Sequence, residues 1–163
     1  MSMFAKLASA QGTGTDNWLK KGRTLIRVES VEAVEPPAAL KTSFKVRGRI
    51  LFSSNPENEV GQQGTANENF KYPESALARV RTFVKAMKSF KEQRQVLDSE
   101  CGPEALREIA GESQPMVGVI IAVDATLKNT DPTKSGYTLY TGAVPTAEEI
   151  EHLIQIGALK QAA

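Results

Sequence analysis

The sequence predicts a soluble, mainly β protein with helices, built around one five-stranded barrel. Short segments rich in β-branched residues are separated by turn-forming stretches, which is typical of strands in small β-rich domains. One longer segment, 74–91, changes to helical periodicity after the third of these strands. The chain of 163 residues, 40% hydrophobic and 24% charged, is long enough to bury one core without disulfides or metals.

The first strand is expected over 23–34, where β-branched residues partly alternate with charged ones. Ile26 and Val28 fall on one side, and the charged residues fall on the other: Arg23, Arg27 and Glu29. The proline pair at 36–37 then ends the strand, because proline cannot donate a ladder hydrogen bond.

The second strand, expected over 42–52, has the clearest alternation in the chain. Its apolar face is formed by Phe44, Val46, Ile50 and Phe52, and its opposite face is a row of three cations, Lys45, Arg47 and Arg49. The strand itself contributes no acid to that row. Three like charges in line are unfavourable without a counterion, so this row is the leading candidate for a surface that binds a polyanion.

The polar loop at 53–69 runs into a third strand around 60–70. The helix over 74–91 then carries an apolar stripe flanked by cations, as an ordinary surface helix does. A second, short helix is expected over 103–110, where Gly111 ends it.

Two further strands are expected over 116–127 and 137–144, joined by a turn at 131–136. In the tail, Thr146 and Glu149 have the spacing of a capping box, which predicts that a C-terminal helix begins there.

Three strands, a helix, two strands and a final helix is the order of a five-stranded Greek-key barrel of the oligonucleotide-binding (OB) type. In this OB-like fold one helix lies between strands 3 and 4, although other small α+β folds share the same order. The sequence thus divides into a flexible N-terminal arm (1–17), an OB-like nucleic-acid-binding domain (18–145) and a C-terminal helix (146–163).

The composition argues against an enzyme and against a cofactor or metal site. Cys101 and His152 are the only cysteine and histidine, and the chain has neither a phosphate-binding glycine loop nor a nucleophile-elbow motif. No apolar run approaches the roughly 20 residues that a membrane helix requires. The first ten residues do not resemble a secretory signal, so we expect a cytoplasmic protein.

Single-stranded nucleic acid requires cations along its backbone and aromatic faces for its bases. The cation row supplies the first, and Arg23, Arg27 and Lys71 would widen it. Candidates for stacking are Trp18, Phe70, Tyr72, Tyr137 and Tyr140. Tyr137 and Tyr140 differ in parity, so they point to opposite sides of their strand. Periodicity assigns four phenylalanines to the core: Phe44, Phe52, Phe83 and Phe90.

Several segments resemble phage-encoded single-stranded DNA-binding proteins: Lys20-Lys21-Gly22-Arg23, Ser53-Ser54-Asn55, Val60-Gly61, Asn69-Phe70-Lys71 and the helix from Ala76 to Ala86. The likeness covers roughly residues 18 to 90. It implies a barrel that coats and protects exposed single-stranded DNA, largely without sequence preference, during phage DNA replication or recombination. It also implies replication or recombination proteins as partners, with the host cell cytoplasm as the location.

The C-terminus departs from this resemblance. Many such proteins end in a flexible acidic tail, whereas this chain ends in Gly-Ala-Leu-Lys-Gln-Ala-Ala. The last helix either packs on the barrel or forms a homodimer contact through its apolar residues, Ile150, Leu153, Ile154 and Ile156. The alternative function is a non-enzymatic protein-interaction or virion-structural module, and the choice between DNA and RNA stays open.

Overall fold

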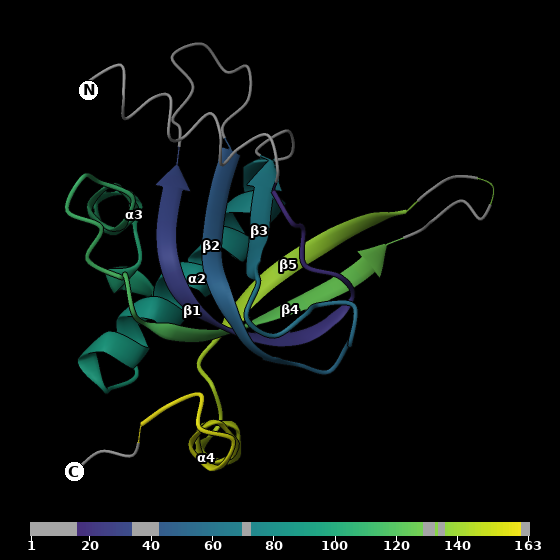
Figure 1. Ribbon diagram of the computed structural model, residues 1–163. Coiled ribbons are helices and arrows are strands. Elements are labelled where there is room, and N and C mark those ends of the chain that lie inside the picture. The colour runs from purple at the N-terminus through teal and green to yellow at the C-terminus, as the bar shows by residue number, and fades with distance from the viewer. Residues whose placement is uncertain (1–15, 34–42, 70–72, 129–132, 134–135, 161–163) are drawn as a thin grey trace, which may run out of the picture.

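Five antiparallel strands form one open sheet in the computed structural model (Figure 1). They are β1 (Gly22–Ala33), β2 (Ser43–Ser53), β3 (Gln63–Asn69), β4 (Ile120–Lys128) and β5 (Tyr137–Ala143). The order across the sheet is β3-β2-β1-β4-β5, so β1 pairs with both β2 and β4. The structure describes residues 16–33, 43–69, 73–128, 133 and 136–160.

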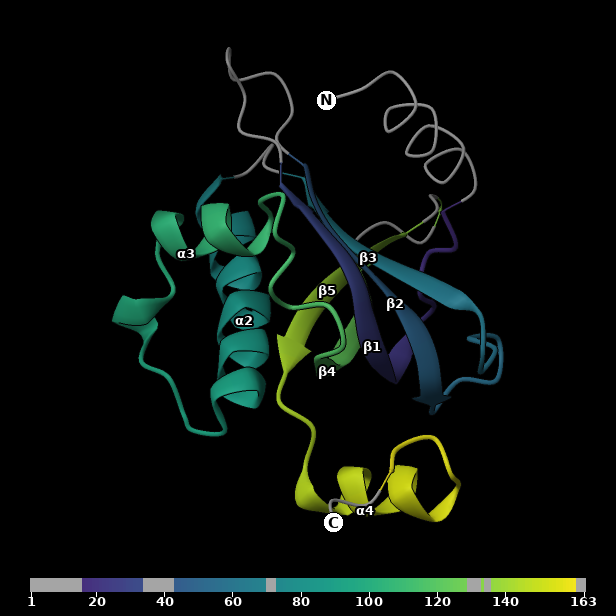
Figure 2. The same cartoon turned by 60° about the vertical axis from the view of Figure 1, so that its left-hand side comes forward.

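Helices α2 (Pro73–Glu92), α3 (Pro103–Ile109) and α4 (Ala147–Gln155) complete the described part, with a single 3₁₀ turn at Asp98–Glu100. In Figure 2, α2 and α3 lie on one side of the sheet, and α4 lies apart from them beyond the end of β5. The predicted capping box is confirmed, because the Glu149 amide donates to Thr146 Oγ1 (3.1 Å) and the Thr146 amide donates to Glu149 Oε1 (3.0 Å).

The predicted elements are present, with boundaries close to the expected ones except at β4. This strand begins at Ile120 rather than at residue 116. Gly118 has a φ of 92°, which favours glycine, and its amide donates to Val28 O at 2.8 Å. The apolar run from 116 therefore forms a turn before it enters the sheet.

The main core lies between the concave side of the sheet and α2. Phe44 of β2 and Phe83 of α2 are both fully buried, and their ring centroids are 5.5 Å apart. The helix approaches β5 at Gly142, where an added Cβ would lie 2.9 Å from the Phe83 Cα. A glycine at this position lets α2 sit directly on β5.

A second core lies on the opposite side of the sheet, beneath α4. Its buried members are Leu25, Leu51, Ile120, Ala122 and Leu153, so α4 packs on the sheet. Assigning Phe52 to the core was wrong: its side chain is 38% exposed and contacts the ring of His152, with the centroids 4.9 Å apart. The cause is a bulge, because Leu51 is an extra residue between two paired positions and turns Phe52 to the α4 side.

Candidate nucleic-acid interface

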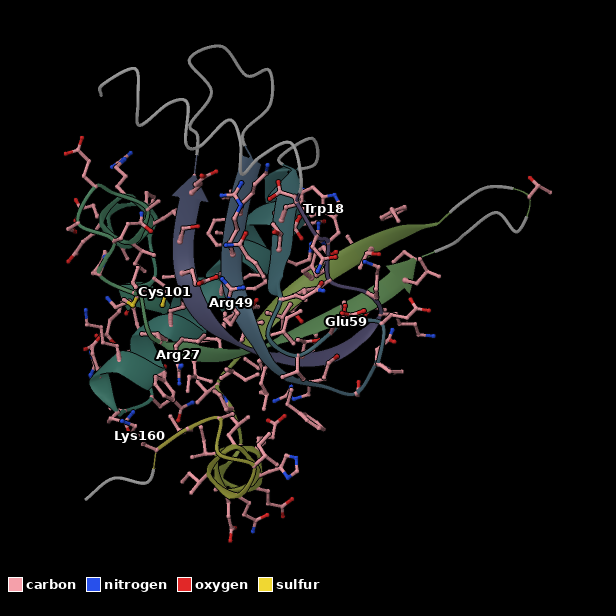
Figure 3. All side chains as sticks on the ribbon, viewed as in Figure 1. Trp18, Arg27, Arg49, Glu59, Cys101 and Lys160 are labelled. Carbon is pink, nitrogen blue, oxygen red and sulfur yellow. The ribbon has the colours of Figure 1, made fainter. Side chains whose placement is uncertain are left out.

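The cation row predicted on β2 lies on the side of the sheet that faces away from α2. The register places Lys45 opposite Asn67, Arg47 opposite Thr65 and Arg49 opposite Gln63 of β3. Opposed residues of an antiparallel pair share one face, so β2 and β3 together form this surface. We call it the β2–β3 face. Arg49 is labelled on it in Figure 3.

Asp16 joins two of the three cations. Its carboxylate accepts from Lys45 Nζ at 3.0 Å and from Arg47 Nε at 2.9 Å, and the Thr65 hydroxyl lies 3.3 Å from the same carboxylate. The side chains of Asp16 and Arg47 are only 4% and 8% exposed. This cluster is therefore largely withdrawn from solvent.

Glutamates of β1 neutralise the rest of the row. Arg47 Nη1 contacts Glu32 at 2.8 Å, and Arg49 Nη2 contacts Glu29 at 3.0 Å. The β2 strand itself contributes no acid to the row, and the counterions come from β1 and from Asp16. A second bulge explains why, since Glu29 is an extra residue in β1 and reverses the alternation after it. Glu32 is thereby turned to the same face as the cations.

The segment 16–19 runs parallel to the free edge of β3. The Thr65 amide donates to Asn17 O (2.9 Å), and the Leu19 amide donates to Thr65 O (3.0 Å). On the other side, Tyr140 of β5 donates its hydroxyl to Leu19 O at 2.8 Å. Residues 16 and 17, which the sequence assigned to the arm, are thus fixed against the sheet, and the segment links the two edge strands.

Trp18 stands beside β3 at the edge of this face (Figure 3), and its side chain is 40% exposed. Lys45 Nζ lies 5.5 Å from the centroid of the indole ring, within the range of a cation–π contact. A partly exposed indole beside an ammonium group offers one surface for a base and one charge for a phosphate.

The other stacking candidates differ in how far their side chains are exposed. Tyr137 is 59% exposed, whereas Tyr140 is 3% exposed and its ring belongs to the main core. The predicted difference in parity is confirmed, but Tyr140 has no free face for a base. Phe70, Lys71 and Tyr72 lie outside the described residues.

Arg23 does not extend the β2–β3 face, whereas Arg27 lies opposite Arg49 in the β1–β2 register and therefore on the same side of the sheet. Arg23 binds Glu149 of α4 through Nε (2.9 Å) and Nη2 (2.8 Å), and Asp124 of β4 through Nη1 (2.9 Å). Arg27 donates to Ala158 O just after α4. The sequence predicted that both would widen the patch. Arg23 is held instead by acids of α4 and β4, whereas Arg27 stays beside Arg49.

The ionisation of the Asp16 cluster follows from its contacts. Burial of the Asp16 carboxyl raises its pKa, but hydrogen bonds from Arg47 and Lys45 outweigh burial and leave the pKa below its usual value. Burial also disfavours the charged form of Arg47 and so lowers its pKa. The hydrogen bonds to Asp16 and Glu32 outweigh burial and leave the pKa of Arg47 above its usual value. Asp16 and Arg47 are therefore both charged at neutral pH.

Sequence reasoning missed Asp16 and Thr65. Asp16 follows a run of glycine, threonine and glutamine, which is typical of a loop, and no pattern within that run links it to β2. Thr65 lies in a strand whose alternation is too weak to assign a face. Only the pairing of segment 16–19 with β3 brings these side chains to the cations.

Other kinds of site have less support. Within the described residues, no group of three or more His, Cys, Asp or Glu side chains is placed to hold a metal ion. No helix in that part of the chain is long and apolar enough to cross a membrane. A hollow of about 640 Å³ lies between α2 and the end of β5, and its lining includes Phe90, Val144 and Ile150.

Comparison with models of known protein families and with curated proteins finds no match to this chain.

Proposed function

We propose that the protein binds single-stranded DNA across the β2–β3 face, largely without sequence preference, and protects exposed strands during DNA replication or recombination. Lys45, Arg47 and Arg49 contact the phosphate backbone in this proposal, and a base stacks on Trp18. The protein is a binding module without catalytic chemistry, and its partners beyond DNA are replication or recombination proteins.

The strand order supports this proposal. A sheet ordered β3-β2-β1-β4-β5, with α2 between β3 and β4 in the chain, is compatible with the connections expected of an OB barrel. Segment 16–19 contacts both edge strands, which is where such a barrel closes. OB barrels bind oligonucleotides on the face of strands 2 and 3, the face on which the cation row lies.

The single observation that carries the proposal is Trp18 beside Lys45. A large aromatic side chain that is 40% exposed is not needed for the core. Its position next to a cation on an outer strand face combines the two contacts that unpaired nucleotides require. Tyr137, more exposed still, lies on β5 and is a secondary candidate.

One observation favours a different function. Each cation of the row has a carboxylate within 3.0 Å, so the β2–β3 face is close to neutral and attracts a polyanion less than three unpaired cations would. A protein-interaction or virion-structural module is therefore the second candidate. The two functions differ in how binding to DNA depends on salt.

The first test is the anisotropy of a labelled dT oligonucleotide of about 30 nucleotides, titrated with protein at several salt concentrations beside a duplex of equal length. We expect tighter binding to the single strand and a clear weakening with salt. Trp18→Ala should weaken binding by roughly 5- to 150-fold, the equivalent of about 1 to 3 kcal/mol for one stacked base.

Arg49→Ala and Arg94→Ala are a matched pair for the backbone contact. Both arginines are about equally exposed (45% and 46%) and ion-paired, but Arg94 follows α2, away from the β2–β3 face. Arg49→Ala should lower the slope of log Kd against log salt by about 0.7, the value for one contact to a single strand, and Arg94→Ala should not. Absence of binding to any nucleic acid at low salt would favour the interaction module.

A further inference from the structure

Asp16 occupies a site whose donors suit a phosphate. Lys45 Nζ, Arg47 Nε and the Thr65 hydroxyl converge on one carboxylate, at 3.0, 2.9 and 3.3 Å. Two cations and a hydroxyl are also the donors that bind a phosphodiester group, because carboxylates and phosphates accept the same charge-assisted hydrogen bonds. The carboxylate therefore marks an anion site on the proposed DNA-binding face.

Asp16 does not satisfy this site completely. Arg47 Nη2 is the one buried side-chain nitrogen or oxygen without a hydrogen-bond partner among the described residues. Nη2 and Nε form one edge of the guanidinium group. Asp16 accepts from this edge with only one oxygen, because its other oxygen accepts from Lys45. Arg23 provides the contrast, since its Nε and Nη2 each receive an oxygen of Glu149.

A phosphodiester would supply what Asp16 lacks. Its two non-bridging oxygens and its ester oxygens offer more acceptors than a carboxylate, so Nε, Nη2 and Lys45 can be bound together. An unpaired buried donor is costly, and the gain from satisfying it favours the ligand that reaches it.

We propose that Asp16 is an internal competitor for a phosphate site formed by Lys45, Arg47 and Thr65, and that DNA binds there by displacing it. This inference rests on the proposed function and adds a regulatory contact to it. Asp16 is held near the site by its own chain, which gives it a high effective concentration. DNA binds only to molecules in which Asp16 has left the site. The apparent affinity for DNA therefore falls as the fraction of molecules with Asp16 in the site rises.

Trp18 is linked to the displacement of Asp16 through Lys45. It follows Asp16 by two residues, and Lys45 Nζ contacts both the carboxylate and the indole ring. When the carboxylate leaves, Lys45 and Arg47 become available to one phosphate while the indole stays beside them for a base. Pairing of Leu19 with β3 holds the end of the segment in place during this change.

The test compares Asp16→Asn with Asp98→Asn by anisotropy with the same dT oligonucleotide. Both variants remove one ion-paired carboxylate, but Asp98 pairs with Lys85 of α2, away from the β2–β3 face. We expect Asp16→Asn to bind at least 5-fold more tightly than the wild type. Its slope of log Kd against log salt should steepen by about 1 to 1.5, since two cations become available. Asp98→Asn should change Kd by less than 2-fold.

A second measurement follows DNA binding in the wild-type protein and does not use Asp16→Asn. In the wild type, the Arg47 Nε–H resonance, assigned by its loss in Arg47→Lys, should shift when the dT oligonucleotide is added, because its acceptor changes from carboxylate to phosphate. A resonance that stays fixed at saturating DNA would overturn the inference.

The outcomes separate this inference from the proposed function. If the wild type binds DNA but Asp16→Asn binds equally or more weakly, Asp16 is only a structural contact and the inference is wrong. If only Asp16→Asn binds, DNA does not displace Asp16 in the wild type, and the inferred displacement is wrong. If neither protein binds single-stranded DNA at low salt, the proposed function fails, and the inference falls with it.

Discussion

Tyr140 holds the segment before β1 against the sheet through a single hydroxyl group. The group is buried and donates to Leu19 O, which connects β5 to the segment that pairs with β3. Leu19 is itself 1% exposed and contributes to the main core. A contact of this kind matters for function as well as stability, because Asp16 and Trp18 belong to the segment that it fixes.

Tyr140→Phe should lower the free energy of unfolding by about 1 to 3 kcal/mol, because the buried Leu19 carbonyl loses its donor while the ring still fills its place. Urea unfolding followed by circular dichroism measures the change. Tyr137→Phe, at a position 59% exposed, is the matched control and should stay within about 0.5 kcal/mol of the wild type. Equal effects of the two variants would contradict this role.

The same residue predicts a dependence on alkaline pH. Burial raises the pKa of Tyr140 to about 12, above the value of about 10 for an unfolded tyrosine. A raised pKa in the folded state means that the stabilisation is complete below pH 10 and is lost as pH rises from 10 towards 12. Thermal melting at pH 9 and 11 should show a smaller loss for Tyr140→Phe than for the wild type.

Among the elements, α4 covers a face of the sheet that would otherwise expose apolar side chains. Leu153 is fully buried against Leu25, Leu51 and Ile120, and Arg23 ties the first turn of the helix to β1 through Glu149. The helix therefore belongs to the folded unit. The sequence left open whether its apolar residues pack on the sheet or join two copies of the chain, and Leu153 serves the first role.

Leu153→Ala should reduce the free energy of unfolding by about 2 to 5 kcal/mol, since it leaves a cavity between α4 and the sheet. Ile156→Ala removes an apolar side chain that is 49% exposed and should cost much less. Chemical denaturation of both variants measures the difference. If the two lose similar stability, α4 does not depend on Leu153 for its packing.

Over the whole molecule, ion pairs connect segments that are far apart in the sequence. Asp16 binds β2, and Glu149 of α4 binds Arg23 of β1. Hydrogen bonds from Arg47 and Lys45 keep the pKa of Asp16 low against the effect of burial, and the hydrogen bond from Arg23 lowers that of Glu149. These contacts hold the first and last described parts of the chain to the sheet.

The protein should lose stability as the pH falls below about 4.5. A depressed carboxyl pKa contributes stability above the pKa of the unfolded group, about 4, and that contribution disappears as pH falls through the folded value. Urea unfolding at pH 7 and pH 3 measures the loss. Glu149→Gln should flatten the dependence, whereas Glu148→Gln, the same change at an exposed position of α4, should leave it as steep as in the wild type.

The sequence determined the elements because their signals are local. The alternation of β2, the helical period of 73–92 and the capping box at Thr146 each depend on residues within one turn or one strand. The cation row and the opposite parity of Tyr137 and Tyr140 follow from the same short-range periods, as do the fully buried Phe44 and Phe83.

The surroundings of those residues were decided by the tertiary structure. Two bulges, at Leu51 and Glu29, reverse the faces of the residues that follow them, and neither has a signal in a period-two pattern. They move Phe52 out of the main core and bring Glu32 to the cations. Asp16 reaches Lys45 and Arg47 because its segment pairs with β3, a contact between residues almost 50 positions apart. Charge along a strand is local, but its neutralisation depends on which strands the fold places beside it.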